Sequence, residues 1–102
     1  MSHLKLCISN HDVEAAHERI RKFVKKTPVM TCSHISSLAG GREVYFKVEA
    51  LQKTGSFKFR GATNAVRLML EEGGGDGVVV THSSGNHGQA LAAAAQANGI
   101  EG

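Results

Sequence analysis

Three consecutive valines, Val78–Val80, constrain the fold of this chain more than any other feature. A continuous β-branched run is typical of a strand buried on both faces, as the strands of parallel sheets are. The run leads into a polar turn that contains glycine, Ser83–Gly88, and then into an alanine-rich stretch, 90–97, with a helical composition. The order strand, turn and helix therefore predicts one unit of a parallel α/β sheet.

The preceding segments also alternate between helical and strand patterns, which indicates an α/β class with parallel sheets flanked by helices. Apolar residues at helical spacing predict a helix over 11–24, begun by Ser9 or Asn10, and a short helix over 33–39. Alternation over 42–50 predicts a strand with one face in the core. The other expected elements are a strand or extended arm at 5–8, an extended segment at 29–31, a helix capped by Ser56 that ends before the glycines of 73–77, and a strand starting at Ile100.

Composition excludes several classes of function. The 102 residues are 41% hydrophobic and 21% charged, with a net charge of +3, as in ordinary globular domains. The basic cluster Arg19–Lys26 is interpreted as a solvated helix face rather than a nucleic-acid surface. Cys7, Cys32 and the six histidines lack metal-binding spacing, so we expect reduced thiols and no metal site. The chain has neither an apolar signal segment nor the roughly 20 apolar residues of a membrane span, so we expect a cytoplasmic protein.

Two segments invite functional interpretations that their context does not support. The glycine run 73–77 precedes a predicted strand, whereas phosphate-binding loops follow one, and Val78 stands where a third glycine is needed. We interpret this run as a connector. Ser83 and Ser84 occupy a strand-to-helix turn, but His82 stands where the nucleophile elbow of hydrolases requires glycine.

Lys58 and the turn 83–88 are the strongest candidates for chemistry. Lys58 lies between Phe57 and Phe59, and a lysine removed from water is kept neutral, as a Schiff-base nucleophile must be. A solvated lysine is the common alternative, which the composition leaves open. The turn precedes a helix, whose N-terminal N–H groups bind small anions, and His87 lies there. Together these features predict half of an active site for a carbonyl cofactor and an anionic substrate.

The residue strings at 52–62 (QKTGSFKFRGA) and 81–90 (THSSGNHGQA) resemble those of the fold-type II pyridoxal-phosphate enzymes, which have the tryptophan synthase β-like architecture. Within that group the chain is most similar to the family of serine racemases and serine/threonine dehydratases. The likeness runs from about Cys7 to Ile100. Both strings are specific, and they occur in the family's order and spacing.

The resemblance implies a role for each matching residue. Lys58 forms the Schiff base with pyridoxal 5'-phosphate, Phe57 lines the cofactor pocket, and Asn86 hydrogen-bonds the ring hydroxyl. Ser84 is the acid/base group on the face opposite Lys58. The substrate carboxylate is bound by Ser83, Ser84, Asn86 and His87.

The resemblance also implies the reaction and its partners. We expect interconversion of L- and D-serine together with β-elimination of serine to pyruvate and ammonia, in an enzyme that is a homodimer when full length. ATP and Mg²⁺ are expected effectors of the full-length enzyme. The alternatives are an L-threonine/L-serine dehydratase and a non-catalytic truncated chain that modulates full-length subunits.

The end of the chain departs from the family pattern. In that family the glycine-rich loop for the cofactor phosphate and the partner of the pyridine nitrogen lie downstream of the matched residues. Glu101-Gly102 replaces the proline and apolar strand expected there. We therefore expect a truncated chain with weak or no activity alone, in which 1–76 belong to the large cofactor-binding domain and 77–102 form the first strand–helix unit of the small domain.

Overall fold

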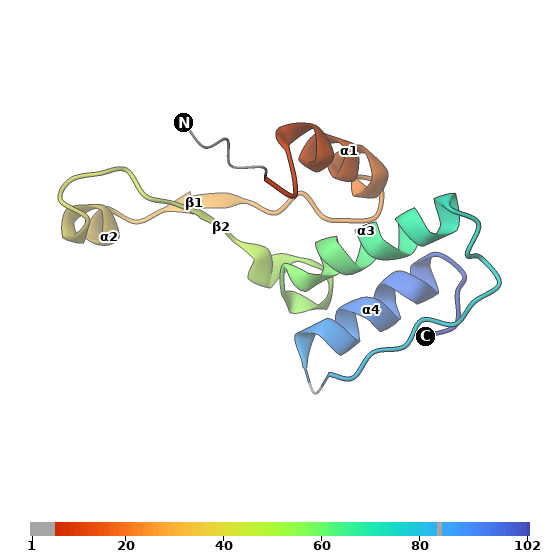
Figure 1. The fold of residues 1–102 in the computed structure, drawn as a ribbon. Coiled ribbons are helices and arrows are strands. Elements are labelled where there is room, and N and C mark those ends of the chain that lie inside the picture. Colours follow the sequence, from red (N-terminus) through yellow and green to blue (C-terminus); the bar gives the residue numbers. More distant parts are fainter. Residues whose placement is uncertain (1–5, 84) are drawn as a thin grey trace.

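The computed structural model describes residues 6–83 and 85–102. Helices dominate these residues, and the two regular strands are short (Figure 1). The elements, in chain order, are α1 (Asn10–Ile20), β1 (Val29–Thr31), α2 (Ser33–Leu38), β2 (Tyr45–Lys47), the 3-10 turns η1 (Glu49–Leu51) and η2 (Lys53–Gly55), α3 (Lys58–Glu71) and α4 (Asn86–Ala97).

Helix α1 begins as the sequence predicts but ends earlier. Ser9 is its N-cap, and the Asp12 carboxylate accepts a hydrogen bond from the Ser9 N–H at 2.7 Å, which completes a capping box. The helix ends at Ile20 rather than at residue 24. Downstream, the side chain of Gln52 binds both the N–H and the C=O of Lys25, each at 2.8 Å. Residues 21–24 form a turn in which the Phe23 N–H donates to the Ile20 carbonyl at 2.8 Å, so the predicted helix end at about residue 24 was wrong.

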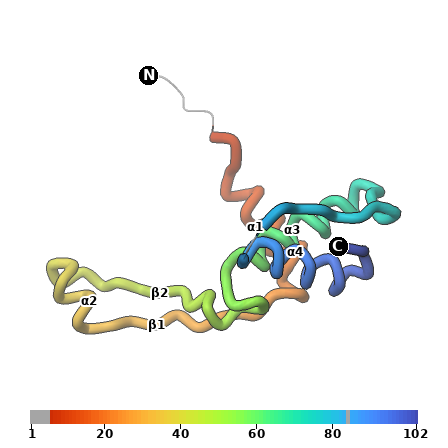
Figure 2. The backbone as a smooth tube through the Cα atoms, turned by 90° about the horizontal axis from the view of Figure 1, so that it is seen from below, coloured from red at the N-terminus to blue at the C-terminus, as the bar shows by residue number. Residues whose placement is uncertain are grey.

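Strands β1 and β2 form an antiparallel pair with α2 at its tip, and this arm extends away from the other helices (Figure 2). Val29 pairs with Lys47 and Thr31 with Tyr45. The extended segment at 29–31 and the short helix after it are confirmed. The strand predicted over 42–50 is only three residues long and pairs with β1. The prediction that one of its faces lies in the core was wrong, because Phe46 of that face is 43% exposed.

The core lies between α3 and α4, with α1 packed on α3. Phe59 and Val66 of α3 are 1% exposed, and Ala90 and Ala94 of α4 are completely buried. Alanines at i and i+4 present one flat face, so the two helices approach closely. The predicted close packing of the alanine-rich helix is confirmed. The full core cluster is Phe59, Ala62, Val66, Ala90, Ala94, Ala95 and Ile100.

The three valines do not form the doubly buried strand that the sequence predicts. Val78 is 57% and Val80 86% exposed. A single parallel bridge joins Val78 to Glu101, and the Val79 N–H donates to the Glu101 carbonyl at 3.1 Å. This one bridge has the predicted parallel sense, whereas β1 and β2 pair antiparallel, contrary to the prediction. Burying both faces of a strand requires neighbouring strands, and the bridge supplies one residue pair.

Three smaller expectations can be compared with the structure. Residues 6–8 form no strand. The N-cap residue of α3 is Phe57 rather than the predicted Ser56. The Ser56 Oγ nevertheless accepts a hydrogen bond from the Lys58 N–H at 3.4 Å. The glycine run ends α3 as predicted, since Gly73 has a φ of 90° that favours glycine. In the part of the chain that the structure describes, every helix is too short or too polar to cross a membrane.

Candidate active site

Lys58 opens onto a pocket of about 420 Å³ between the first turns of α3 and α4. The pocket brings Phe57 and Lys58 together with His87, which the chain separates by an entire helix and an extended segment. Its remaining wall is made of small or apolar side chains. The lining residues are Phe57, Lys58, Gly61, Ala62, Ala65, Val80, Thr81, His87 and Leu91.

The two phenylalanines beside Lys58 have different environments. Phe59 is 1% exposed in the core, whereas Phe57 is 62% exposed, and its ring centroid lies 5.3 Å from the Lys58 Nζ. Successive residues of a helix differ by about 100° in direction, so Phe59 cannot share the face of Lys58. Lys58 itself is exposed. The expectation that two rings remove the Lys58 amine from water was therefore wrong. The amine is accessible to a carbonyl compound.

The start of α4 presents backbone N–H groups that the helical ladder does not use. The Ser83 Oγ accepts from the Gly85 N–H at 3.3 Å, and α4 begins at Asn86. The first hydrogen bond of the helical ladder runs from the Gln89 N–H to the Gly85 carbonyl at 3.3 Å. The N–H groups of residues 86–88 therefore precede the ladder, at the positive end of the helix dipole.

The predicted substrate-binding residues are only partly brought together. Of this set, His87 lines the pocket of Lys58, whereas Ser83 lines a neighbouring pocket. Asn86 is exposed at the first position of α4 and is not among the lining residues of the Lys58 pocket. Ser84, the predicted acid/base residue, lies outside the described residues.

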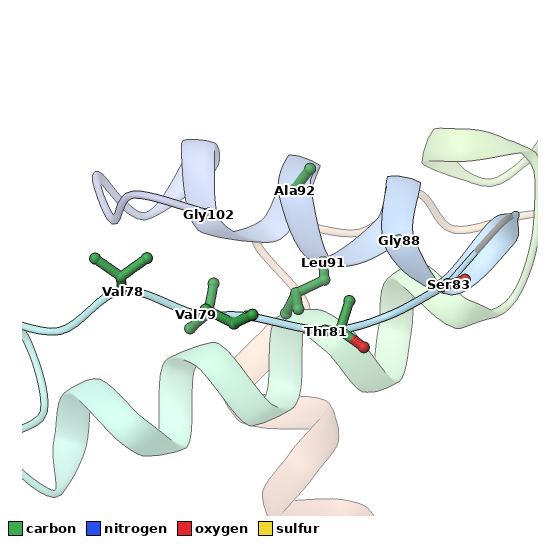
Figure 3. Close-up of a pocket in the computed structure, with 9 residues that line it drawn as sticks. Val78, Val79, Thr81, Ser83, Gly88, Leu91, Ala92 and Gly102 are labelled. Atoms are coloured by element: carbon green, nitrogen blue, oxygen red, sulfur yellow. The ribbon is translucent and has the colours of Figure 1, made fainter.

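The neighbouring pocket, of about 270 Å³, lies where the extended valine segment runs alongside α4 (Figure 3). Leu91 points from α4 toward this segment and contributes to both pockets. A Cβ at Gly88 would lie 3.4 Å from the Ser83 Cβ, at the near limit of ordinary van der Waals contact.

Part of the basic cluster lines a third pocket, of about 490 Å³. Its cationic lining residues are Arg21, Lys25, Lys26, Lys47 and Arg60. Most of its cationic groups already have partners. Arg21 pairs with Glu18 and Arg60 with Glu49, each at 2.9 Å, and the Lys47 Nζ donates to a backbone carbonyl at 2.9 Å. This partnering is consistent with the interpretation of a solvated basic face.

Sequence reasoning missed part of the pocket wall and the polar network around Glu49 and Arg60. Gly61 and Ala65 lie four residues apart on α3, a spacing that places two small side chains on one face. Thr81 follows the valine run directly, at the end of a strand-like segment where α/β proteins bind ligands. Both signals were available in the sequence. No sequence signal indicates the network around Glu49 and Arg60, because this network depends on tertiary contacts.

Comparison with known proteins identifies the class of protein to which this chain belongs. Residues 20–102 match the family described as pyridoxal-phosphate dependent enzyme (PALP), and the chain belongs to that family. Within it, the chain is 60% identical over 85 residues to a serine racemase of Dictyostelium discoideum and 54% identical over 96 residues to that of Homo sapiens. These matches cover 83% and 92% of this chain but 26% and 28% of the relatives.

Solved structures confirm the fold class. A pyridoxal 5'-phosphate-dependent aspartate racemase superimposes with a TM-score of 0.86 at 46% identity, over 96% of this chain and 31% of that one. The Dictyostelium discoideum serine racemase superimposes with a TM-score of 0.81 at 55% identity, over 91% of this chain and 30% of that one. A threonine deaminase superimposes with a TM-score of 0.76 at 38% identity, over 92% of this chain and 32% of that one. The chain therefore has the α/β fold-type II architecture that its motifs predict, and it spans about a third of these structures.

Proposed function

We propose that this chain supplies the lysine-bearing side of a serine racemase-like active site, which interconverts L- and D-serine and eliminates water from serine to give pyruvate and ammonia. The observation that carries the proposal is the convergence of Lys58 and His87 on one pocket. Identities of 54% and 60% to serine racemases support serine as the substrate.

The residues present fit the carbonyl end of pyridoxal phosphate. The Lys58 amine is exposed at the pocket, and a primary amine is the group that condenses with an aldehyde. Phe57 and the small side chains of α3 offer an apolar wall. The family resemblance assigns the ring hydroxyl to Asn86, which is exposed and does not line this pocket. When bound, pyridoxal phosphate acts as an electron sink that acidifies the α-carbon of an amino acid.

The chain's own residues then divide the work. The turn Ser83–His87 binds the substrate carboxylate through N–H groups at the start of α4, which favour negative charge. The Lys58 amine takes or returns the α-proton on one face of the substrate. Racemisation requires a second proton-bearing group on the other face, and we assign that role to Ser84 on the strength of the family resemblance. Loss of the β-hydroxyl after proton removal gives the elimination products.

Two other substrate assignments have specific support. The TM-score of 0.86 to the aspartate racemase supports aspartate as the substrate. The likeness to the threonine deaminase supports a dehydratase without racemase activity. A third alternative is non-catalytic, in which the chain pairs with full-length subunits and modulates them.

The wider properties of the protein follow the same proposal. A full-length enzyme would be a cytoplasmic homodimer regulated by ATP and Mg²⁺. Residues 1–76 would belong to its large domain, and 77–102 would begin the small one. In this family the groups that bind the cofactor phosphate and pyridine nitrogen lie downstream of the matched segment. We therefore expect weak or no turnover by the 102 residues alone.

A chimera tests the function directly. The matched segment of the Dictyostelium discoideum serine racemase is replaced by the corresponding residues of this chain, and D-serine, pyruvate and D-aspartate are measured from the L-amino acids. We expect D-serine and pyruvate to form, both abolished by Lys58→Ala. The Ser84→Ala variant should lose D-serine formation more than it loses pyruvate formation.

Each alternative has its own outcome. Pyruvate without D-serine indicates a dehydratase, and D-aspartate as the main product indicates the aspartate assignment. A folded chimera that turns over serine equally well with Lys58→Ala contradicts the role of Lys58. Failure of the chain to co-purify with a full-length serine racemase subunit removes the modulator alternative.

A further inference from the structure

The segment that leads to Lys58 is tied to the connector after α1. Gln52 is 4% exposed, and its side-chain amide accepts from the Lys25 N–H and donates to the Lys25 carbonyl, both at 2.8 Å. Lys53, the next residue, donates from its Nζ to the Phe23 carbonyl. These bonds hold η1 and η2 against residues 23–25, so the chain reaches Lys58 from a fixed start.

Glu49 links this segment to α3. Its carboxylate accepts two hydrogen bonds from the Arg60 guanidinium, from Nε and from Nη2, each at 2.9 Å. It also accepts from the Thr27 hydroxyl at 2.6 Å and from the Gln52 amide at 3.4 Å. The side chains of Glu49 and Arg60 are 15% and 28% exposed. A bidentate, partly buried pair of this kind is stronger than a surface ion pair.

The position of Arg60 in α3 gives this pair a directional effect on Lys58. Residues 58, 59 and 60 point in directions about 100° apart around the helix axis. Phe59 is fixed in the core, and Arg60 is fixed on Glu49. Lys58 is thereby directed away from both the core and Glu49, to the side of α3 where its pocket lies. With Arg60 released, Phe59 would be the one residue of this first turn still anchored in the core.

We infer that Glu49 and Arg60 are positioning residues for Lys58: their ion pair fixes the rotation of the first turn of α3, so that the Lys58 amine stays in the pocket shared with His87. This inference rests on the proposed function of Lys58. The Arg60 guanidinium holds the pKa of Glu49 at about 2, so the carboxylate stays charged at neutral pH.

A matched control exists at the other end of the same helix. Arg19 of α1 pairs with Glu71 through Nε at 3.1 Å and donates from Nη1 to Asn64 at 2.8 Å. This contact also ties α3 to the N-terminal part of the chain. The contact of Arg19 with Glu71 lies at the last turn of α3 and its contact with Asn64 in the middle of the helix. Neither involves the first turn, so their loss should not rotate that turn.

The experiment compares Arg60→Ala, Arg60→Lys and Arg19→Ala with the unmodified chain. Each protein is treated with pyridoxal phosphate and borohydride, and labelling of Lys58 is expressed relative to Lys22. Amide hydrogen exchange of residues 57–61 is measured in parallel. We expect Arg60→Ala to lower the labelling ratio about tenfold and to speed this exchange. Arg60→Lys should fall between, because lysine cannot make the bidentate contact.

The control separates positioning from general loss of stability. Arg19→Ala should lower the melting temperature but leave the labelling ratio and the exchange at 57–61 unchanged. Equal changes in both alanine variants, or none in Arg60→Ala, would overturn the positioning role. An unmodified chain that labels Lys58 no more than Lys22 would contradict the proposed function of Lys58 instead, while hydrogen exchange would still decide the effect of the pair on the helix turn.

Discussion

The two phenylalanines beside Lys58 show how one residue of separation decides between core and site. Phe59 anchors α3 in the core, where it is 1% exposed, while Phe57 lies at the pocket and is 62% exposed. Their similar chemistry makes them a matched pair, because a single substitution tests stability at one position and the pocket at the other.

Replacement of Phe59 by alanine should lower the free energy of unfolding by about 3 kcal/mol, because it leaves a cavity between α3 and α4. The same replacement at Phe57 should cost less than about 1 kcal/mol, since that ring is largely in solvent. Urea unfolding followed by circular dichroism measures both changes. Equal losses at the two positions would show that the ring of Phe57 is buried in solution.

At the scale of the elements, a charged pair holds the first turn of α3, where Arg60 bonds to Glu49. The hydrogen bonds from Arg60 are the main cause that lowers the pKa of Glu49, with Thr27 and Gln52 adding to the effect. A carboxylate with a lowered pKa stabilises the folded state above its unfolded pKa, and this contribution is lost as the pH falls toward the folded value.

The free energy of unfolding should therefore decrease as the pH is lowered from about 4.5 to about 2. Asp12, whose pKa is lowered by its backbone hydrogen bond to Ser9, adds to the same trend. The Arg60→Ala variant should be less stable at neutral pH and should show a shallower decrease in acid. Thermal melts at stepped pH measure the difference. Parallel curves for the two proteins would contradict the assignment to Glu49.

The elements that sequence predicts well are those whose signals are local. The Ser9 cap, the alanine face of α4 and the glycine that ends α3 depend on residues within a turn or two, and all three are confirmed. The prediction of a buried strand at the valine run was wrong, because the burial of a strand depends on neighbours elsewhere in the chain. The motif around Lys58 predicted a functional lysine, but not its exposure or the Glu49–Arg60 pair, which depend on tertiary contacts.

At the scale of the whole molecule, the chain is more extended than a compact domain of its length. Its radius of gyration is 17.0 Å, compared with about 13 Å for a compact chain of this size. The arm of β1, α2 and β2 accounts for part of the difference (Figure 2). Large apolar side chains on this arm and on the valine segment remain exposed, among them Met30, Leu38, Tyr45, Val78 and Val80.

Exposure of the valine segment makes a direct prediction about stability. Val80→Ser should change the free energy of unfolding by less than about 0.5 kcal/mol, because the side chain is 86% exposed. Val66→Ser, at a position 1% exposed in the core, should cost several times more. Chemical unfolding of both variants provides the comparison. A large loss from Val80→Ser would show that this segment is covered in solution.

The central claim is that Lys58 is the cofactor-binding lysine, and one measurement tests it most directly. The purified chain is incubated with pyridoxal phosphate and reduced with borohydride, and the modified lysines are mapped by mass spectrometry. We predict one modification per chain, on Lys58, because its amine opens onto the pocket shared with Phe57 and His87. Labelling spread evenly over the lysines, or absent from Lys58, would contradict the claim.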